Sequence, residues 1–406
     1  MASDPGNPEC KSTIRLLYLL CSIDISCQFM QFAVTPYLAR DLGLDTVGFG
    51  YLQTCFGILQ LVGGPVFGRF SDQNGGRAAL TLSFLSASVF YLILFFTTNI
   101  PLLFLSRLPS AFMHGLPGAQ MIITDLTVES KRADALGKLG LCFGLGIITG
   151  SSLGGYLASK YGLYTPTCIS LVASIICCLI VMVYIPVQTK IKQHVSTSDK
   201  SSKKSSGVFN FSELVRLMTF PDVMAIFTIK VLSGFPIGIF MIMFSVISAH
   251  FFGLDAASSG YLMSYFGIIQ LVVQGVFVGK LSSLYAENTL LLLSMVVSAV
   301  VGLGMMLMTN VFHFCVIAFP MVFALCVSGI ITDSILTKAV PASDTGAMLG
   351  ICASIQPLTR TIGPTIGGYL YKHYGVSSFG ILNITVNLIL LVYFFKRQNR
   401  QTEKIK

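Results

Sequence analysis

QTKIKQHVSTSDKSSKKSSGVFNFSELVRLMTF, residues 188–220, is the only long polar segment of this chain. The whole sequence has 406 residues, of which 54% are apolar and only 11% are charged. The segment is rich in Lys and Ser and lacks the apolar side chains that would offset the entropy lost when a chain becomes ordered. We therefore interpret it as a flexible linker that divides the protein into two halves.

Each half contains six apolar runs of about 20 residues, long enough to cross the ~30 Å hydrocarbon core of a bilayer as a helix. The runs are continuously apolar rather than alternating, which favours helices over a membrane β-barrel. The sequence thus predicts an all-α membrane protein with twelve transmembrane helices in two six-helix bundles. The predicted parts are a cytoplasmic N-terminus (1–12), an N-terminal bundle (13–187), the linker (188–221), a C-terminal bundle (222–395) and a basic cytoplasmic tail (396–406).

The net charge of +9 is explained by membrane topology. Most Lys and Arg residues fall on the side that holds both termini, and only Arg40, Lys160 and Lys372 are expected outside. This bias follows the positive-inside rule, so no nucleic-acid partner is needed to explain it. None of the eleven cysteines has metal-ligand spacing, so no metal or cofactor is expected. The sequence leaves the plasma membrane and the endoplasmic reticulum open, and a monomer is favoured.

The first span carries a polar stripe that predicts a functional site. Asp24, Gln28 and Gln31 recur at helical spacing and share one face of the expected helix. A charge in the middle of a membrane costs about 3 kcal/mol even on the lenient insertion scale. Asp24 should therefore face a water-filled cavity or a partner instead of lipid.

Other polar residues interrupt the apolar spans of both halves. Arg107 and His114 are expected on one stripe of the fourth span, where Pro109 and Pro117 mark possible kinks. Lys230 lies near the inner end of the seventh span, and Gln356 and Arg360 share a face of the eleventh. Arg360 is too far from either helix end to reach water easily, so we expect it to be functional. Lys230 is expected either to reach the cytoplasm or to contribute to the same site.

The second half repeats the first. GYLQTCFGILQLV at 50–62 recurs as GYLMSYFGIIQLV at 260–272, and Ile122-Ile123-Thr124-Asp125 recurs as Ile330-Ile331-Thr332-Asp333. Repeats this long and in this order indicate two parallel six-helix units. In transporters built this way, the substrate site lies between the repeats near the middle of the membrane.

The turn after the second span resembles the signature of the major facilitator superfamily, a family of transporters. The pattern of a glycine, three residues, Asp, a basic residue, any residue, Gly and two basic residues maps onto 68–77. Gln73 and Gly76 stand where the family has basic residues. The resemblance implies that Asp72 forms an inter-helix latch in which Arg77 is one possible partner. The candidate gating and motif residues are Gly68, Asp72, Gly75 and Arg77 of this turn, Asp125 and its repeat equivalent Asp333, Gly146, Gly150 and Gly154 of the fifth span, and Gly363 and Pro364 of the eleventh.

The glycine-rich fifth span resembles the antiporter motif of the same family. Gly146, Gly150 and Gly154 are spaced by four residues, so they allow helices to approach closely, and packing is their first role. Gly363-Pro364 supplies in the eleventh span the Gly-Pro pair that the fifth span lacks. More narrowly, the sequence resembles the organic-cation-transporter-like branch, which is itself similar to tetracycline-type drug/proton antiporters.

These patterns predict a transporter that moves a small organic solute by alternating access, and no catalytic constellation indicates an enzyme. The resemblance implies exchange of an organic cation for a proton. Asp24 is the residue expected to exchange the proton, with hydrogen bonds from Gln28, Gln31, His114 and Gln356. An alternative is an organic-anion carrier, because Asp24 is outnumbered by Arg107, Lys230 and Arg360. A further alternative is a non-transporting scaffold that acts through its linker and tail.

Overall fold

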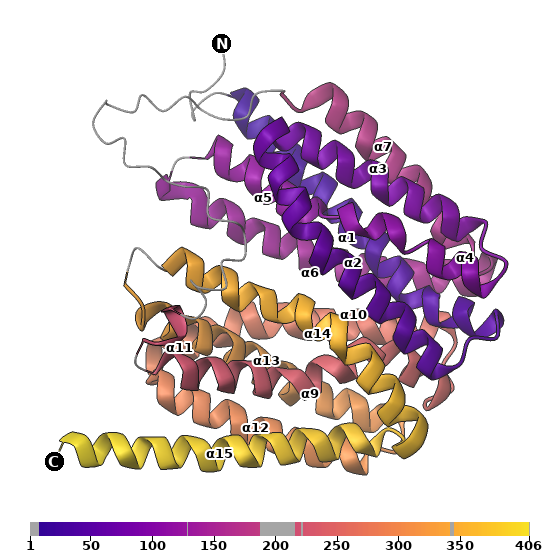
Figure 1. Cartoon of the computed structure of the whole chain (residues 1–406). Coiled ribbons are helices and arrows are strands. Elements are labelled where there is room, and N and C mark those ends of the chain that lie inside the picture. Colours follow the sequence, from indigo (N-terminus) through magenta and orange to yellow (C-terminus); the bar gives the residue numbers. More distant parts are fainter. Residues whose placement is uncertain (1–7, 128, 187–215, 221, 342–344, 406) are drawn as a thin grey trace, which may run out of the picture. The chain divides into compact units, whose positions relative to one another are not determined.

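The computed structural model describes residues 8–127, 129–186, 216–220, 222–341 and 345–405 (Figure 1). Within those ranges the chain is helical and contains no strand, which confirms the predicted all-α fold. Of the predicted linker, 188–221, only 216–220 lie in the described part. The predicted bundle boundaries stay predictions.

The helices before the linker differ from the prediction mainly in the fourth span. That span is broken into two α-helices joined by a short 3₁₀ turn. The elements are α1 (Pro8–Asp41), α2 (Thr46–Asn74), α3 (Gly76–Phe95), α4 (Ile100–Leu105), η1 (Leu108–Phe112), α5 (Gly115–Leu126), α6 (Glu129–Tyr161) and α7 (Thr165–Tyr184).

The helices after the linker include one segment of π-helix. The elements are α9 (Val223–His250), α10 (Ala256–Val272), η2 (Val273–Val278), α11 (Gly279–Leu284), α12 (Glu287–Leu307), α13 (Val311–Lys338), α14 (Thr345–Tyr374) and α15 (Ser377–Ile405). The basic tail predicted from residue 396 continues α15 as one helix instead of leaving it.

Nine helical segments in the described ranges are long and apolar enough to cross a membrane. The remaining three predicted spans correspond to α2, the broken segment α4–η1–α5, and α14. These three hold glycines, prolines and charged residues that lower their apolar character. The described helices are therefore consistent with twelve spans.

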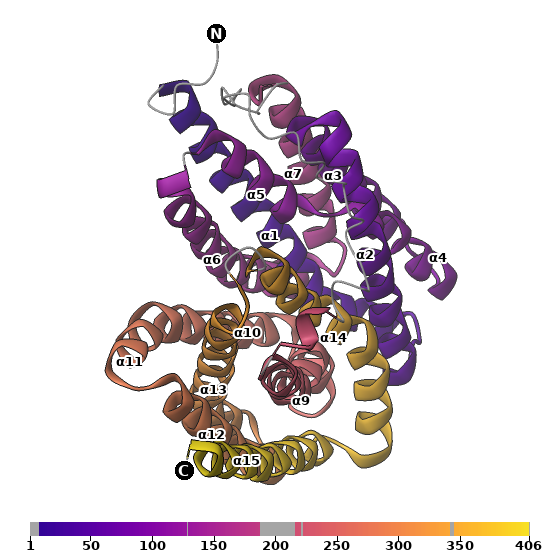
Figure 2. The ribbon, with the colours of Figure 1, turned by 60° about the vertical axis from the view of Figure 1, so that its left-hand side comes forward.

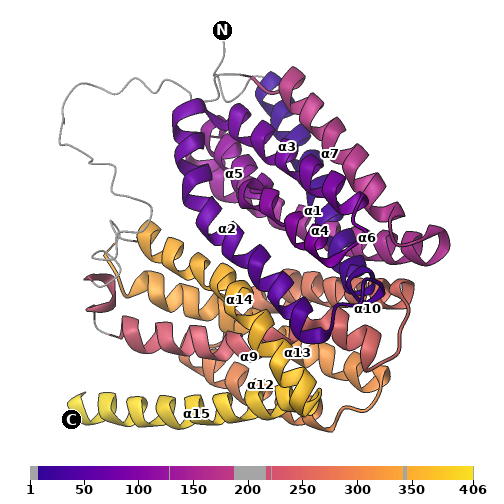
Figure 3. The same cartoon turned by 45° about the vertical axis from the view of Figure 1, so that its right-hand side comes forward.

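The chain forms two compact units. The first contains residues 1–45, 55–208 and 254–267, and the second contains 46–54, 209–253 and 268–406. Each unit thus includes the start of one long helix from the other half of the sequence. In the first unit α1 packs on α6 and α3 lies beside α7 (Figure 3). In the second unit α9 packs on α14 and α12 lies beside α15 (Figure 2).

Glycines allow the close helix contacts of both units. In the first, a Cβ atom on any of three α6 glycines would overlap α1. The glycines and the α1 residues they meet are Gly146 with Ile25, Gly150 with Ser26 and Gly154 with Met30. In the second, Gly367 of α14 meets Ile239 and Met243 of α9 in the same way. The packing role expected for the α6 glycines is therefore seen directly.

The sequence repeat also appears as matched hydroxyl contacts, one in each unit. Ser152 of α6 and Ser264 of α10 join their hydroxyl oxygens at 2.7 Å in the first unit. Thr54 of α2 and Thr365 of α14 join theirs at 2.8 Å in the second. Thr54 and Ser264 occupy equivalent positions of the repeat, as do Ser152 and Thr365. The duplicated sequence therefore forms the same contact twice.

Five helix connections turn on a glycine with positive φ. They are Gly43 (84°), Gly75 (84°), Gly162 (100°), Gly253 (64°) and Gly375 (68°). Gly43 and Gly253 are repeat equivalents, and so are Gly162 and Gly375. A side chain at such φ values is strained, so glycine keeps these connections short.

Candidate functional site

Asp24 lies in the middle of α1 and is buried, with 6% of its surface exposed. Its Oδ2 accepts a hydrogen bond of 3.0 Å from Nε2 of Gln28, one turn along the helix. A Cβ atom at Gly115 would lie 2.5 Å from the same Oδ2. Only a glycine therefore fits beside the carboxylate.

Gly115 begins α5, so the positive end of this helix lies against Asp24. The unsatisfied N–H groups of a helix N-terminus stabilise a nearby negative charge. The sequence creates this end by breaking the fourth span. Pro109 lies in the intervening 3₁₀ turn, and its ring nitrogen supplies no N–H group for an α-helical hydrogen bond. A discontinuous helix inside a membrane is typical of transporter binding sites.

The break separates the residues predicted to share a stripe on the fourth span. Arg107 immediately precedes η1, and His114 immediately precedes α5. His114 Nε2 lies 3.1 Å from the carbonyl oxygen of Ala111, and its ring lies 5.2 Å from that of Phe67. The prediction that Arg107 and His114 lie on one continuous helix is therefore wrong. The break nevertheless places the helix end beside Asp24.

Arg107 is buried, with 4% of its surface exposed. Its guanidinium carbon lies 5.1 Å from the centre of the Phe90 ring, in a cation–π contact. Within the described residues, Nε and Nη2 of Arg107 have no hydrogen-bond partner. Buried guanidinium nitrogens without a partner are costly, so this position suits an additional acceptor.

Gln31 contacts a different helix from Asp24 and Gln28. Its Nε2 donates a hydrogen bond of 3.3 Å to Ser170, and its Oε1 accepts one of 3.1 Å from Thr167, both on α7. Both ends of the amide are therefore used between α1 and α7. The structure brings together Asp24 and Gln28 of the predicted stripe, and Gln31 joins α1 to α7. The role of Gln31 in solute binding stays a prediction.

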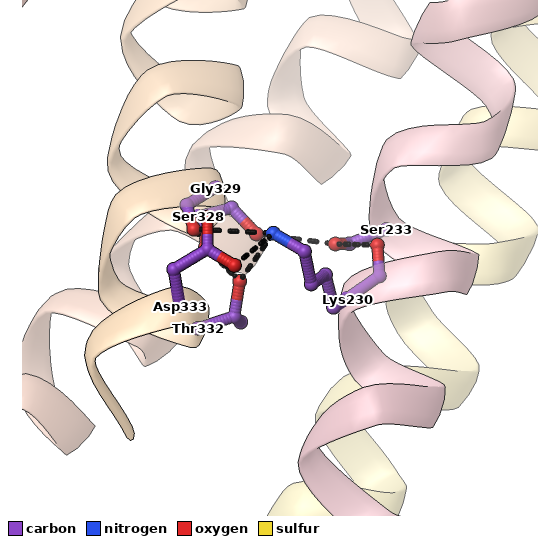
Figure 4. Close-up of polar contacts among 6 residues, drawn as sticks. All are labelled: Lys230, Ser233, Ser328, Gly329, Thr332 and Asp333. Atoms are coloured by element: carbon purple, nitrogen blue, oxygen red, sulfur yellow. Dashed lines mark hydrogen bonds and ion pairs between the residues drawn. The ribbon is translucent and has the colours of Figure 1, made fainter. Parts of the chain in front are cut away.

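In the second unit, Lys230 of α9 pairs with Asp333 of α13 (Figure 4). The Nζ atom of Lys230 lies 2.9 Å from Oδ1 of Asp333. The sequence repeat predicts a gating role for Asp333 and leaves the partner of Lys230 open. The predicted topology could have suggested this pair. Lys230 and Asp333 both lie a few residues from the same predicted end of neighbouring spans.

Arg360 lies in α14 and is partly exposed. Among the residues with described side chains, it makes no hydrogen bond or ion pair. Gln356 lies one turn earlier, and its side chain is outside the described part, as is that of Asp72 in α2. The predicted contacts of Gln356 and Asp72 therefore stay predictions.

The turn that resembles the superfamily signature is more helical than expected. α2 continues through Gly68 to Asn74, Gly75 makes the turn with a φ of 84°, and α3 starts at once. Arg77 donates a hydrogen bond to the carbonyl oxygen of Met182 in α7. A side chain at Gly76 would overlap Ile122, which explains why the basic residue of the family pattern is absent here.

The remaining predicted gating residues lie on two further helices. Asp125 is partly buried near the end of α5. Gly363 and Pro364 are buried in α14. A Cβ atom at Gly50, in the segment of α2 that belongs to the second unit, would lie 2.5 Å from the carbonyl oxygen of Pro364. Their role in gating stays a prediction.

Buried charges beside a broken helix, in a duplicated all-helical membrane protein, define a solute transporter. The sequence profile of the Major Facilitator Superfamily matches residues 16–229 and 226–406, and the chain belongs to this family. It is thus an integral multi-pass membrane protein.

Curated relatives match along nearly the whole chain. Rat solute carrier family 22 member 18 is 53% identical over 389 residues, which cover 95% of this chain and 93% of the relative. Human solute carrier family 67 member A1 is 50% identical over 401 residues, covering 97% and 95%. The class B tetracycline resistance protein of Escherichia coli is 25% identical over 330 residues, covering 80% and 79%.

Solved structures show the same fold at low sequence identity. The human organic anion transporter MFSD10 superposes with a TM-score of 0.67 at 16% identity, over 96% of this chain and 99% of that one. A single-residue mutant of the peptide transporter POT gives a TM-score of 0.75 at 15% identity, over 94% of both chains. These similarities confirm the predicted fold.

Proposed function

We propose that this protein is a secondary active transporter that exchanges an organic cation for a proton by alternating access. The observation that carries the proposal is Asp24, a buried carboxylate that accepts its hydrogen bond from the neutral amide of Gln28. A buried carboxylate without a fixed positive partner can be neutralised either by a proton or by a cationic solute. Competition between the two for one carboxylate produces exchange.

The helix break supports this role for Asp24. The N-terminus of α5 stabilises the ionised carboxylate when neither proton nor solute is bound. Because Gly115 leaves no side chain between the helix end and the carboxylate, a small rearrangement of the break would alter this stabilisation. The protonated and ionised forms can thus be favoured in different conformations.

The distant relatives favour a drug-like solute. The chain is 24% identical to multidrug resistance protein 1 of Bacillus subtilis over 345 residues, in addition to the tetracycline resistance proteins. The names of these relatives refer to resistance against drugs. A drug-like organic cation is therefore the solute class that we propose for this chain.

The test is transport by purified protein in proteoliposomes with a labelled organic cation, with and without a pH gradient. We compare the wild type with Asp24→Asn and with Asp41→Asn, which makes the same change at an exposed carboxylate on the same helix. Asp24→Asn should abolish uptake driven by the gradient, and Asp41→Asn should retain it. Gradient-driven uptake by folded Asp24→Asn protein would contradict the proposal.

An organic-anion carrier is the second candidate, and Arg107 is the observation that favours it. Its buried nitrogens without partners could hold the carboxylate or sulfonate of a solute. The pairing of Lys230 with Asp333 reduces the excess of positive charge on which this alternative was based. Labelled anions are therefore tested in the same vesicles. Anion uptake that Arg107→Gln or Arg360→Gln abolishes would establish this candidate instead.

Topology and assembly complete the proposal. We propose that both termini lie in the cytoplasm, which the bias of Lys and Arg supports. Access would alternate by movement of one half of the sequence against the other, with Asp72 and Arg77 in the latch. We propose that a single chain is the transporting unit.

A further inference from the structure

The ammonium group of Lys230 is surrounded by oxygen atoms of a single turn of α13 (Figure 4). Its Nζ lies 2.9 Å from Oδ1 of Asp333, 3.4 Å from the carbonyl oxygen of Gly329 and 3.5 Å from the hydroxyl oxygen of Thr332. A primary ammonium has three N–H donors and no acceptor. The three oxygens therefore match its donors in number and in type.

The hydroxyl group of Thr332 is held in the acceptor role. Its hydrogen is directed to the helix backbone, where the carbonyl oxygens of Ser328 and Gly329 lie 2.6 and 3.0 Å away. The lone pairs of Thr332 are thus left for Lys230. The lone pairs of each oxygen have a fixed direction, so the arrangement is suited to a cation with N–H groups.

The oxygens and the ammonium belong to different helices. Gly329, Thr332 and Asp333 are all on α13, whereas Lys230 extends from α9 on a flexible four-carbon chain. A separate hydrogen bond of 3.1 Å between Ser233 and Ser328 also joins α9 to α13. The oxygen cluster would consequently persist if Lys230 moved away.

The cluster is accessible from one side. The side chain of Asp333 is 39% exposed, whereas that of Lys230 is 12% exposed. The oxygen that binds Nζ, Oδ1, is itself buried, so a soluble cation approaches the exposed part of the carboxylate and reaches Oδ1 as Lys230 leaves. The described ranges contain no group of three or more His, Cys, Asp or Glu residues that could hold a metal ion, so the oxygens favour a monovalent ligand over a transition metal.

We propose that Gly329, Thr332 and Asp333 form a binding site for a primary ammonium group, and that Lys230 is a built-in occupant which a soluble amine displaces. The proposal goes beyond transport, because binding at this site can be measured without solute movement and without Asp24. Displacement of Lys230 removes the ion pair between α9 and α13. Occupancy by an external amine would thus weaken one contact inside the second unit.

The experiment is thermal unfolding of the purified full-length protein in detergent, titrated with methylammonium chloride. Lys230→Met removes the competing ammonium and keeps a side chain of similar length. The variant should unfold at a lower temperature than the wild type, and methylammonium should restore its stability in a saturable way. The wild type should need about tenfold or more methylammonium, because Lys230 occupies the site.

Two control salts and two double variants test whether the stabilisation is specific for a primary ammonium group at this site. Tetramethylammonium chloride has no N–H donors, and sodium chloride supplies an inorganic cation at the same ionic strength; neither should reproduce the methylammonium shift. Lys230→Met with Asp333→Asn should lose the shift. Lys230→Met with Ser233→Ala should keep it, because Ser233 is adjacent to the cluster but does not contact Nζ.

Each contrary outcome overturns the assignment. Equal shifts with tetramethylammonium or sodium would show a general salt effect or an inorganic cation site. A shift that persists with Asp333→Asn would place binding elsewhere. If Lys230→Met does not fold, the wild-type titration carries the test, and the absence of a saturable, methylammonium-specific shift there would refute displacement.

Discussion

The fourth span of the first half and its repeat equivalent in the second half differ in continuity. α13 runs unbroken from Val311 to Lys338 despite an internal proline, Pro320. The equivalent segment of the first half is divided into α4, η1 and α5 around Pro109. Both segments contain the same four residues, Ile-Ile-Thr-Asp, at 122–125 and 330–333.

The two forms of this span present different chemistry. The broken form directs a helix N-terminus toward Asp24, which lies on another helix. The continuous form presents a carboxylate, a hydroxyl and a carbonyl on one turn to Lys230. The two halves thus share the repeated helices and carry different charged sites. The following predictions test whether these differences carry the function.

The largest effect is expected at the helix break, from Gly115→Leu. Any side chain here would overlap the carboxylate of Asp24. Overpacking of this kind costs about 1–3 kcal/mol, and more where a charged group is displaced. The variant should lose transport and unfold at a lower temperature, measured by vesicle uptake and thermal unfolding. Gly329→Ala on the continuous helix is the control, because no atom lies within 4 Å of its added Cβ, and it should fold normally.

The second-largest effect is a difference in stability between variants of Asp333 and variants of Asp24. Asp333→Asn leaves Lys230 without its ionic partner and should destabilise the protein by about 1–2 kcal/mol, discounted because Asp333 is partly exposed. Asp24→Asn replaces a buried charge by a neutral amide and should leave stability unchanged or raise it. Thermal unfolding of both variants measures the contrast. Equal destabilisation would mean that Asp24 has an ionic partner in the folded protein.

Smaller losses of stability, equal in the two units, are expected at the hydroxyl pairs that the repeat preserves. Thr54→Val and Ser152→Ala each remove one hydroxyl from matched pairs. Each should cost about 0.5–1.5 kcal/mol, the usual net value of one hydrogen bond. Chemical or thermal unfolding of the two variants should give similar losses. A loss confined to one of them would show that the repeat-equivalent contacts are not energetically equivalent.

The smallest effect concerns Asp255, at the start of α10 and outside the apolar span. Hydrogen bonds from Ser258 and from Ser159 lower the pKa of Asp255. Because the folded-state pKa is below that of the unfolded chain, the stabilisation is present above about pH 4 and is lost as the pH falls through the lowered value. The unfolding temperature of Asp255→Asn should therefore fall less at acidic pH than that of the wild type. Asp41→Asn, which changes an exposed carboxylate of α1, should leave that slope as in the wild type.

Much of the fold could be predicted from the sequence, because it depends on patterns that lie within one helix or recur in both halves. Apolar run length identified the membrane spans, and the recurrence of 50–62 at 260–272 identified the two halves. The Asp24–Gln28 contact was also predictable, because both residues lie on one turn of one helix. The motifs of the turn at 68–77 and of the fifth span predicted the family, which the sequence profile confirms.

The rest of the site depends on contacts between helices, which periodicity does not report. Gln31 has the spacing of a site residue, yet Thr167 and Ser170 use its amide. The Lys230–Asp333 pair joins residues 103 positions apart, and no repeat pattern links them. The break at 106–114 could be predicted only as kinks, because a proline in sequence does not tell whether a helix bends or ends.

Four of the five glycine turns also determine how the chain can be probed in an intact vesicle. In the predicted topology of twelve crossings, the connections at 42–45, 162–164, 251–255 and 375–376 each follow an odd number of crossings and are expected on the side opposite the termini. Connections this short cannot enter the active site of a protease, whereas the linker carries lysines at 190, 192, 200, 203 and 204. Trypsin added to one face should thus cut the protein into two halves, and trypsin added to the other should leave it whole.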